Sequence, residues 1–154
     1  MQVVLYFCGV KNKKIKFRSD CPISTALDIF GDKWSLLIVR DMMFKGLNTY
    51  GDFLNAGEKI ATNILADRLM MLEAGEIISK HKHPDSKAKV LYKLTAKGID
   101  LVPALTEIIL WSEKHHEVHP FATQFTKQIK KDKTRTIKQI RTGLKNNFKN
   151  SSTL

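Results

Sequence analysis

The stretch EKIATNILADRLMMLEAGEII, residues 58–78, decides the fold of this chain. On a helix of about 3.6 residues per turn, its residues separate into two faces. One side carries Ala61, Ile64, Leu65, Leu69 and Leu72, and the other carries Thr62, Asn63, Ala66, Asp67 and Met70. The first side is expected to pack, while the second is small and weakly polar near its N-terminal end, which suits close approach to a partner. We therefore predict an amphipathic helix over residues 61–74, which Gly75 ends.

A second short helix is expected just upstream. Thr49 is placed to cap it, and Asp52 completes a near capping box, with Asp in place of the usual Glu. Residues 56–60 then form a tight turn that contains a glycine. Two short helices joined in this way are typical of a helix-turn-helix, whose second helix enters the DNA major groove.

The segment downstream predicts a β-hairpin, or wing, over about residues 77–94. Residues 77–83 and 89–94 have the character of strands, and residues 84–87 form a turn cluster. The hairpin carries the basic residues Lys80, His81, Lys82, His83, Lys87 and Lys89. We expect the lysines to contact DNA phosphates or the minor groove, although the same lysines could simply protect an edge strand from aggregation. Neither role is favoured for the two histidines.

Helices on both sides are expected to supply the scaffold. Pro22 opens one that runs to Phe30, and Asp32 caps another from Lys33 to Lys45, whose apolar run over residues 36–39 predicts a central, buried helix. After the wing, Thr95 caps an apolar helical stripe that Pro103 should kink or divide. We expect this stripe to form a dimer interface, the alternative being that it folds onto the chain's own core. The interface candidates are Leu105, Ile108, Ile109 and Trp111.

Several motifs occur together in a fixed order: CPISTALDIFGDKWSLLIVRDMMFKG at 21–46, TYGDFL at 49–54, KIATNILADRLMMLEAGEII at 59–78 and YKLTAKGIDLVPAL at 92–105, followed by Trp111. With them the chain resembles the HxlR family of bacterial winged-helix transcription regulators, relatives of the MarR type, over residues 21–116. The resemblance implies a homodimeric, cytoplasmic protein that binds double-stranded DNA and represses or activates nearby genes. The expected fold is mainly α with a small β-hairpin (α+β), a winged helix-turn-helix. Residues 1–19 would form an N-terminal extension, 20–119 the domain with its dimerisation helix, and 120–154 a basic helical extension.

The resemblance places Thr62, Asn63 and Ala66 on the helix that reads DNA. Thr62 and Ala66 offer methyl groups to thymine, and Asn63 pairs with adenine or binds a phosphate. Asp67 would accept a hydrogen bond from the amino group of cytosine, or it would form an ion pair with a neighbouring basic side chain such as Lys59. For Arg68, a structural ion pair and a phosphate contact are equally open. Thr49 is a further candidate for contact with DNA.

Charge favours a polyanionic partner. The chain has 26 Lys and Arg against 15 Asp and Glu, a net charge of +11. Much of the excess lies in residues 120–154, which contain one acidic residue, Asp132. Apolar residues recur there at helical spacing among the lysines, so residues 121–149 predict a basic amphipathic helix. An alternative function follows, in which this segment binds RNA, anionic membrane or a partner protein. No membrane span is expected, because the apolar run at 3–10 is too short; it could form an extra strand or a dimer arm.

Cysteine and histidine give limited signals. With only Cys8 and Cys21, the chain fits a reducing compartment. Cys21 precedes a helix start, where the helix dipole and Arg18 favour a thiolate and Asp20 opposes it. In several HxlR-like regulators a cysteine at this place is the sensor of an oxidant or electrophile; the other interpretation is a half-buried structural residue. The pairs His81 with His83 and His115 with His119 do not predict a metal site. No cofactor and no enzymatic activity are expected, since no phosphate loop or catalytic motif occurs.

Overall fold

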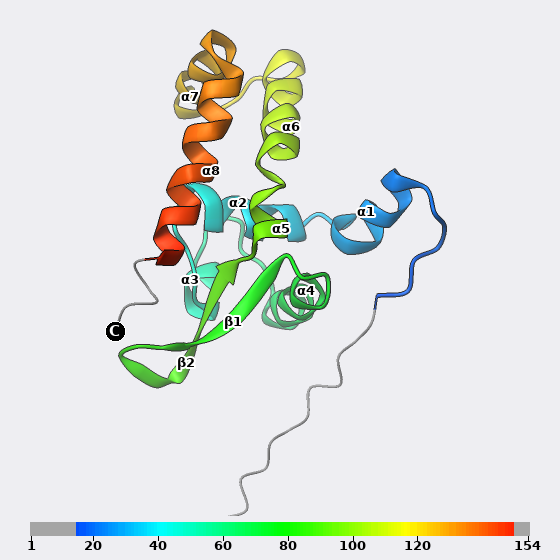
Figure 1. Ribbon diagram of the computed structural model, residues 1–154, viewed down its shortest axis with the longest axis vertical. Helices are drawn as coiled ribbons and strands as arrows, with labels where there is room; N and C mark the ends of the chain where they lie inside the picture. Colours follow the sequence, from blue (N-terminus) through cyan, green and yellow to red (C-terminus); the bar gives the residue numbers. More distant parts are fainter. Residues whose placement is uncertain (1–14, 150–154) are drawn as a thin grey trace, which may run out of the picture.

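The computed structural model describes residues 15–149, which form a mainly helical body with a single two-stranded hairpin in that range (Figure 1). The elements are α1 Pro22–Phe30, α2 Ser35–Phe44, α3 Tyr50–Leu54, α4 Thr62–Ala74, β1 Ile78–His83, β2 Ser86–Leu94, α5 Ala96–Ile99, α6 Val102–His115, α7 Pro120–Lys131 and α8 Lys133–Lys149. The predicted winged helix-turn-helix fold is confirmed. The apolar run at 3–10 and Cys8 lie outside the described residues.

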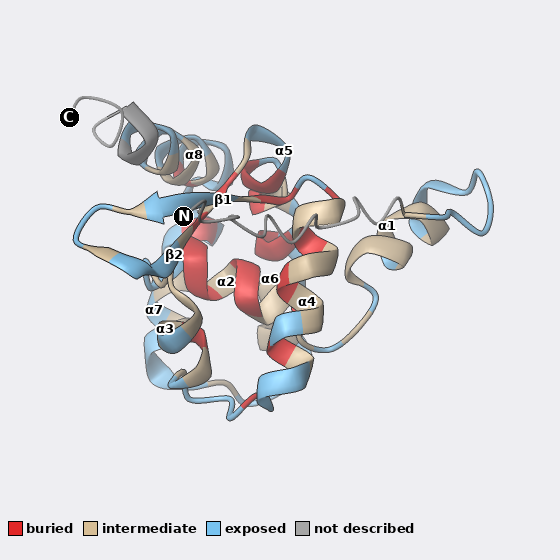
Figure 2. Ribbon diagram, turned by 90° about the horizontal axis from the view of Figure 1, so that it is seen from below, coloured by how far each residue is buried: buried red, intermediate tan, exposed pale blue. Residues whose placement is uncertain are grey.

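Helix α2 crosses the centre of the molecule (Figure 2). It begins at Ser35, two residues later than predicted, with Trp34 at the N-cap position. The Asp32 carboxylate accepts hydrogen bonds from the backbone N–H groups of Trp34 and Ser35 at 2.7 and 2.9 Å and so holds the approach to the helix. Its buried apolar residues are Ile38, Val39, Met42 and Met43. The predicted buried run at 36–39 is correct for its second half, whereas Leu36 and Leu37 are only half-buried.

The helix-turn-helix comprises α3 and α4. Thr49 and Asp52 form the predicted capping box, and Phe53 fixes α3 in the core. In the turn that follows, Lys59 has a φ of 54° and Ile60 is buried, so the chain reverses direction around an apolar anchor. Leu65, Leu69 and Leu72 bury the inner face of α4, and the helix ends at Gly75 as predicted.

The wing is an antiparallel hairpin in which Ile78 pairs with Leu94 and Lys82 with Val90. Strand β2 begins at Ser86, not at 89, and the turn is correspondingly shorter than residues 84–87. The reason is the pairing of His83 with Ser86, which follows an irregularity in the register after Lys82. A short bridge between Thr49 and Leu91 and a 2.7 Å hydrogen bond from the Tyr92 N–H to the Asn48 carbonyl join the hairpin to the helix-turn-helix.

After the wing, the chain forms two consecutive helices, one of the two outcomes predicted from Pro103. Thr95 caps α5 by accepting a hydrogen bond from the Gly98 N–H, and Pro103 lies in the first turn of α6, where its missing N–H costs nothing. Leu105, a predicted dimer contact, is instead 5% exposed and belongs to the protomer's own core. The alternative that the stripe folds onto its own core is therefore correct for this residue.

Residues 120–149 form two helices instead of one, because the chain breaks at Asp132. Helices α7 and α8 fold back along α6 (Figure 1). Ile129 is fully buried, and Ile137, Ile140 and Leu144 pack against the hydrophobic core. Most of the apolar face of the extension is thus covered by the same chain, whereas Phe121, in the first turn of α7, is 77% exposed. Among the described residues, no helix has the length and apolar character needed to cross a membrane.

The Asp32 carboxylate also links two helices, since it pairs with Arg68 of α4 at 3.2 Å. Burial opposes its ionisation, but hydrogen bonds from Ser35, Trp34 and Arg68 prevail and lower the pKa of Asp32 below its ordinary value. A carboxylate with a lowered folded-state pKa stabilises the fold above the unfolded pKa of about 3.9, and this contribution is lost as the pH falls through the folded value.

We predict that Asp32→Ala lowers the free energy of unfolding by about 1–2 kcal/mol at pH 7, because the cap of α2 is lost. The difference from the wild type should shrink as the pH falls from about 4, where the unfolded state begins to bind the proton, through the lowered pKa of the folded carboxylate. Urea unfolding at several pH values would measure both effects. Asp85→Ala, in the exposed hairpin turn, is the control and should change stability by less than about 0.5 kcal/mol. A difference that persists unchanged down to pH 2 would contradict this role.

Candidate nucleic-acid interface

The outer face of α4 presents the three side chains that the sequence singled out. Thr62, Asn63 and Ala66 are all exposed, and they lie on the first two turns of the helix. Ala61 occupies the N-cap position and supplies no side-chain hydrogen bond. The first backbone N–H groups of α4 therefore remain open to an external acceptor, and such groups bind phosphate well.

Tyr50 fixes the start of this helix. Its hydroxyl donates a 2.9 Å hydrogen bond to the backbone carbonyl of Thr62, so α3 holds the N-terminal end of α4 directly. The sequence did not single out Tyr50, since its partner lies twelve residues away across the turn. Arg40 of α2 binds Glu58 in that turn at 3.0 Å, which gives the turn a second anchor.

Arg68 forms the structural ion pair that was one of its two predicted roles. Its guanidinium lies 3.2 Å from Asp32 and also contacts Asp67. Asp67 thus forms its ion pair with Arg68 and not with Lys59, the basic residue that the sequence suggested. Because Asp67 is held by the next residue of its own helix, its charge is partly compensated where it faces outward.

The wing divides its lysines between two surroundings. Lys80 lies 2.7 Å from Glu73 at the end of α4, so it connects the root of the hairpin to the recognition helix. Lys82, Lys87 and Lys89 are exposed, and none of them makes an ion pair within residues 15–149. The outer part of the hairpin therefore carries the charge that an anionic partner would meet.

The histidines of the wing take part in local contacts. His81 lies 2.9 Å from the Ser79 hydroxyl, and His83 accepts a hydrogen bond from the Asp85 N–H. Burial and the nearby charge of Lys93 lower the pKa of His81 below its ordinary value. Within the described residues, no group of three His, Cys, Asp or Glu side chains is placed to hold a metal ion.

Thr49 performs a structural task at the base of the interface. Its hydroxyl accepts a hydrogen bond from the Asp52 N–H at 3.2 Å, and its own N–H donates to the Asp52 carboxylate at 2.9 Å. Contacts with Thr49 and Asn48 lower the pKa of Asp52, against a smaller opposing effect of burial. The contact of Thr49 with DNA stays a prediction, and its hydroxyl already caps α3.

Exposed apolar side chains also occur on α1 and on α6. Helix α1 buries none of its residues and projects from the body on the side away from α8 (Figures 1 and 2). Its exposed apolar side chains include Ile23, 71% exposed, and Leu27; Phe17 precedes the helix. On α6, Trp111 is 61% exposed and Ile108 is also exposed, whereas Ile109 is half-buried.

Cys21 lies at the N-terminal boundary of α1 and is exposed, so the interpretation of a half-buried structural residue is wrong. Arg18, expected to favour its thiolate, is bound to Asp28 at 2.6 Å and thus has another carboxylate partner. The sulfur makes no capping hydrogen bond to α1. The thiol is accessible to reagents in the solvent.

Comparison with known proteins agrees with this geometry. Residues 29–120 match the HxlR-like helix-turn-helix family. An uncharacterized HTH-type transcriptional regulator of Synechocystis is 38% identical over 85 residues, which span 55% of this chain and 62% of that protein. The HTH-type transcriptional regulator YodB of Bacillus subtilis is 31% identical over 63% of this chain and 87% of its own length.

Two solved structures support the likeness in three dimensions. The reduced form of YodB superposes with a TM-score of 0.54 and 29% identity, covering 64% of this chain and 97% of the other. The redox regulator HypR in its oxidized form gives a TM-score of 0.56 and 28% identity, covering 64% of this chain and all of the other. The family match ends at residue 120, so most of α7 and all of α8 lie beyond it.

Proposed function

Since the chain belongs to the HxlR-like helix-turn-helix family, whose relatives are named transcriptional regulators, we propose that it recognises a specific DNA sequence with α4 in the major groove. The outer wing contacts the sugar-phosphate backbone beside it. One observation carries this proposal. Thr62, Asn63 and Ala66 are small and exposed on a helix whose first N–H groups are open, beside a hairpin with exposed lysines.

The two surfaces have different tasks in this proposal. Thr62 and Ala66 present methyl groups, and Asn63 presents a paired donor and acceptor, so α4 supplies sequence preference. Lys82, Lys87 and Lys89 neutralise phosphates and supply affinity that is independent of sequence. Lys80 and Arg68 orient the wing and α4 through their ion pairs.

We propose further that the protein acts as a homodimer in the cytoplasm, where it would meet chromosomal DNA. Ile23 and Leu27 of α1 and Ile108 and Trp111 of α6 are large exposed apolar side chains, and a second copy would remove them from water. A two-fold dimer also presents two recognition helices to two half-sites, which multiplies the affinity of one small reading surface.

A redox response through Cys21 is proposed as the mode of regulation. Its thiol is exposed beside the proposed dimer surface, and the similar structures include the reduced form of the regulator YodB and the oxidized form of the redox regulator HypR. An oxidant would remove two electrons and two protons from two thiols and leave a disulfide that joins Cys21 to a small thiol or to Cys21 of the second protomer. A disulfide at α1 would alter how the two protomers meet.

Asn63 is the residue at which recognition can be tested. Asn63→Ala should weaken binding to the preferred duplex by roughly 5- to 150-fold, because a good base contact contributes about 1–3 kcal/mol of discrimination, while binding to random duplex stays nearly unchanged. Electrophoretic shift assays would measure both affinities, with the DNA upstream of the protein's own gene as the preferred duplex and a random duplex for comparison. Gln128→Ala, on α7, is the control. Equal losses on both duplexes would show that Asn63 does not read sequence.

Assembly can be tested on the apolar surface of α1 and α6. Ile23→Glu combined with Trp111→Glu should convert the dimer to a monomer, because two charges would be buried at the interface. Sedimentation velocity at several protein concentrations would report the change. Val90→Glu, which alters an exposed apolar residue of the wing, should leave the dimer intact. A wild-type protein that sediments as a monomer at micromolar concentration would refute the dimer.

Regulation can be tested at the two cysteines. Cys21→Ser should bind DNA normally in reductant and should lose any response to diamide or a quinone, while Cys8→Ser serves as the matched control. Affinity measured before and after treatment, with mass spectrometry of the modified cysteine, tests both variants. If the Cys21→Ser protein still responds, the sensing residue lies elsewhere.

A further inference from the structure

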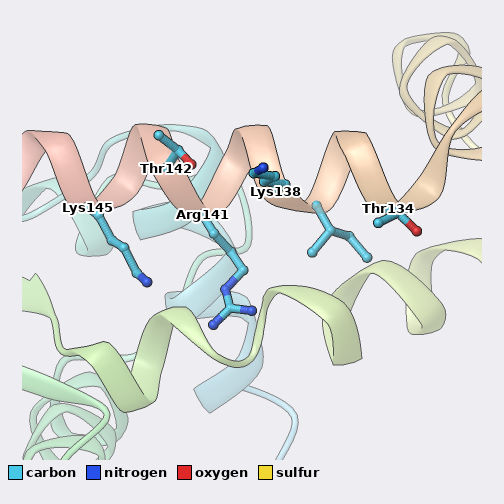
Figure 3. A pocket seen from close by; sticks show the side chains of 6 residues that line it. Thr134, Lys138, Arg141, Thr142 and Lys145 are labelled. Atoms are coloured by element: carbon cyan, nitrogen blue, oxygen red, sulfur yellow. The ribbon is translucent and has the colours of Figure 1, made fainter.

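The extension carries a polar strip along one flank of α8. Six residues line a shallow groove of about 510 Å³ there: Thr134, Ile137, Lys138, Arg141, Thr142 and Lys145. We call this surface the α8 strip. In Figure 3 the side chains of Arg141 and Lys145 reach from α8 toward the yellow-green ribbon of α5 and α6. At about 1.5 Å per residue, the strip from Thr134 to Lys145 is roughly 16 Å long.

We propose that the α8 strip binds the phosphate backbone of duplex DNA outside the wing and so lengthens the DNA contact of each protomer. This inference rests on the proposed function and extends it to a part of the chain beyond the family match. The α8 strip would be a second protein surface that contacts the same DNA molecule, and its contacts would be independent of base sequence.

The chemistry of the strip favours phosphate over a small lipophilic ligand. Pockets for such ligands are lined mainly by hydrophobic and aromatic side chains, whereas the apolar surface of this groove comes from Ile137 and from the aliphatic stems of side chains that end in polar groups. The other five residues offer cations or hydroxyl groups, which are the side chains that bind DNA phosphates. Lys138 and Lys145 are exposed, and neither pairs with a carboxylate in the described part of the chain.

The packing of α8 against the rest of the protein determines where the α8 strip lies relative to the wing. Arg141 binds Asp100, immediately after α5, which ties the middle of α8 to the segment that leaves the wing. Helix α8 descends toward the hairpin, so its C-terminal end lies nearer the wing than its N-terminal end does (Figure 1). A duplex held by α4 and the wing would continue past the hairpin and meet this end of α8 first.

Two observations separate duplex DNA from the other polyanions. Insertion into a membrane needs an exposed apolar face, but on α8 Ile137, Ile140 and Leu144 pack against the protein's own core, and the exposed Phe121 lies on α7, outside the strip. Binding of single-stranded RNA relies on aromatic side chains that stack with bases, and the strip contains none. Regularly spaced cations and hydroxyls suit a continuous phosphate backbone.

The test compares two variants of equal charge. Lys138→Gln with Lys145→Gln removes the free cations of the strip, and Lys127→Gln with Lys131→Gln removes two exposed lysines of α7, at the end of the extension far from the hairpin. The DNA is a duplex that the wild-type protein selects from a random pool, either trimmed to the selected site or lengthened by about ten base pairs on each side, roughly one helical turn. Fluorescence anisotropy at several salt concentrations gives the slope of log affinity against log salt.

On the lengthened duplex, the strip variant should flatten the slope by about 0.9 for each phosphate that its lysines no longer neutralise, hence by about 1.8 per protomer. On the trimmed duplex its slope should equal that of the wild type, and the α7 variant should match the wild type on both. Equal flattening by both variants would overturn the proposal, since net charge alone would explain it. No flattening by the strip variant would also overturn it.

Two further measurements complete the test. Binding to vesicles of phosphatidylserine and to a single-stranded RNA is measured with the same variants; weaker binding to either one, with duplex DNA binding unchanged, overturns the proposal in favour of that partner. The proposed function fails separately, if the wild-type protein selects no duplex from the pool. If the strip variant still selects the same DNA sequence as the wild type while the salt dependence of its DNA binding falls, the result supports both the proposed function and the role of the strip.

Discussion

The burial of three leucines on α4 is the constraint on which the interface depends. Leu65 and Leu72 are completely buried and Leu69 nearly so, against a core that includes α2. Truncating a buried leucine costs about 2–5 kcal/mol, so these side chains fix the rotation of the helix about its axis. Rotating α4 by about half a turn would bring Asn63 inward and leave its amide without partners. The same packing that stabilises the fold therefore determines which side chains face outward.

Polar contacts then place the helix along its length. Tyr50 holds the first turn of α4, and Asp32 holds its middle through Arg68. Exposed ion pairs contribute little stability individually, at most about 1 kcal/mol. Their value here is geometric, because reading base edges requires a helix end fixed to a fraction of an ångström. The ion pair of Lys80 with Glu73 has the same geometric role for the wing, because it fixes the position of the hairpin relative to α4.

Local signals predicted much of this structure, and the misses share a cause. The box of Thr49 and Asp52, the start of α1 at Pro22 and the division at Pro103 all depend on residues within four positions of one another. Two contacts were not predictable in this way: the ion pair of Arg68 with Asp32 and the hydrogen bond of Tyr50 with Thr62. Each joins segments that are distant in the sequence, and no local pattern indicates that such segments meet. Leu105 was assigned to a dimer because periodicity identifies an apolar stripe without identifying what covers it. The break at Asp132 was missed because lysines and isoleucines continue at helical spacing on both sides of it.

The extension shows why net charge alone is a poor guide to function. Lys130 and Lys133 pair with Glu113 and Glu107 of α6, and Arg141 pairs with Asp100, so three of its cations already have partners. These exposed pairs are too weak to hold two helices against the body. Buried Ile129 and the edge-to-face contact of Phe125 with Phe44, at 5.4 Å between ring centroids, supply the larger apolar contribution. Apolar packing therefore holds the extension, the ion pairs fix its register along α6, and the unpaired lysines remain available to a partner.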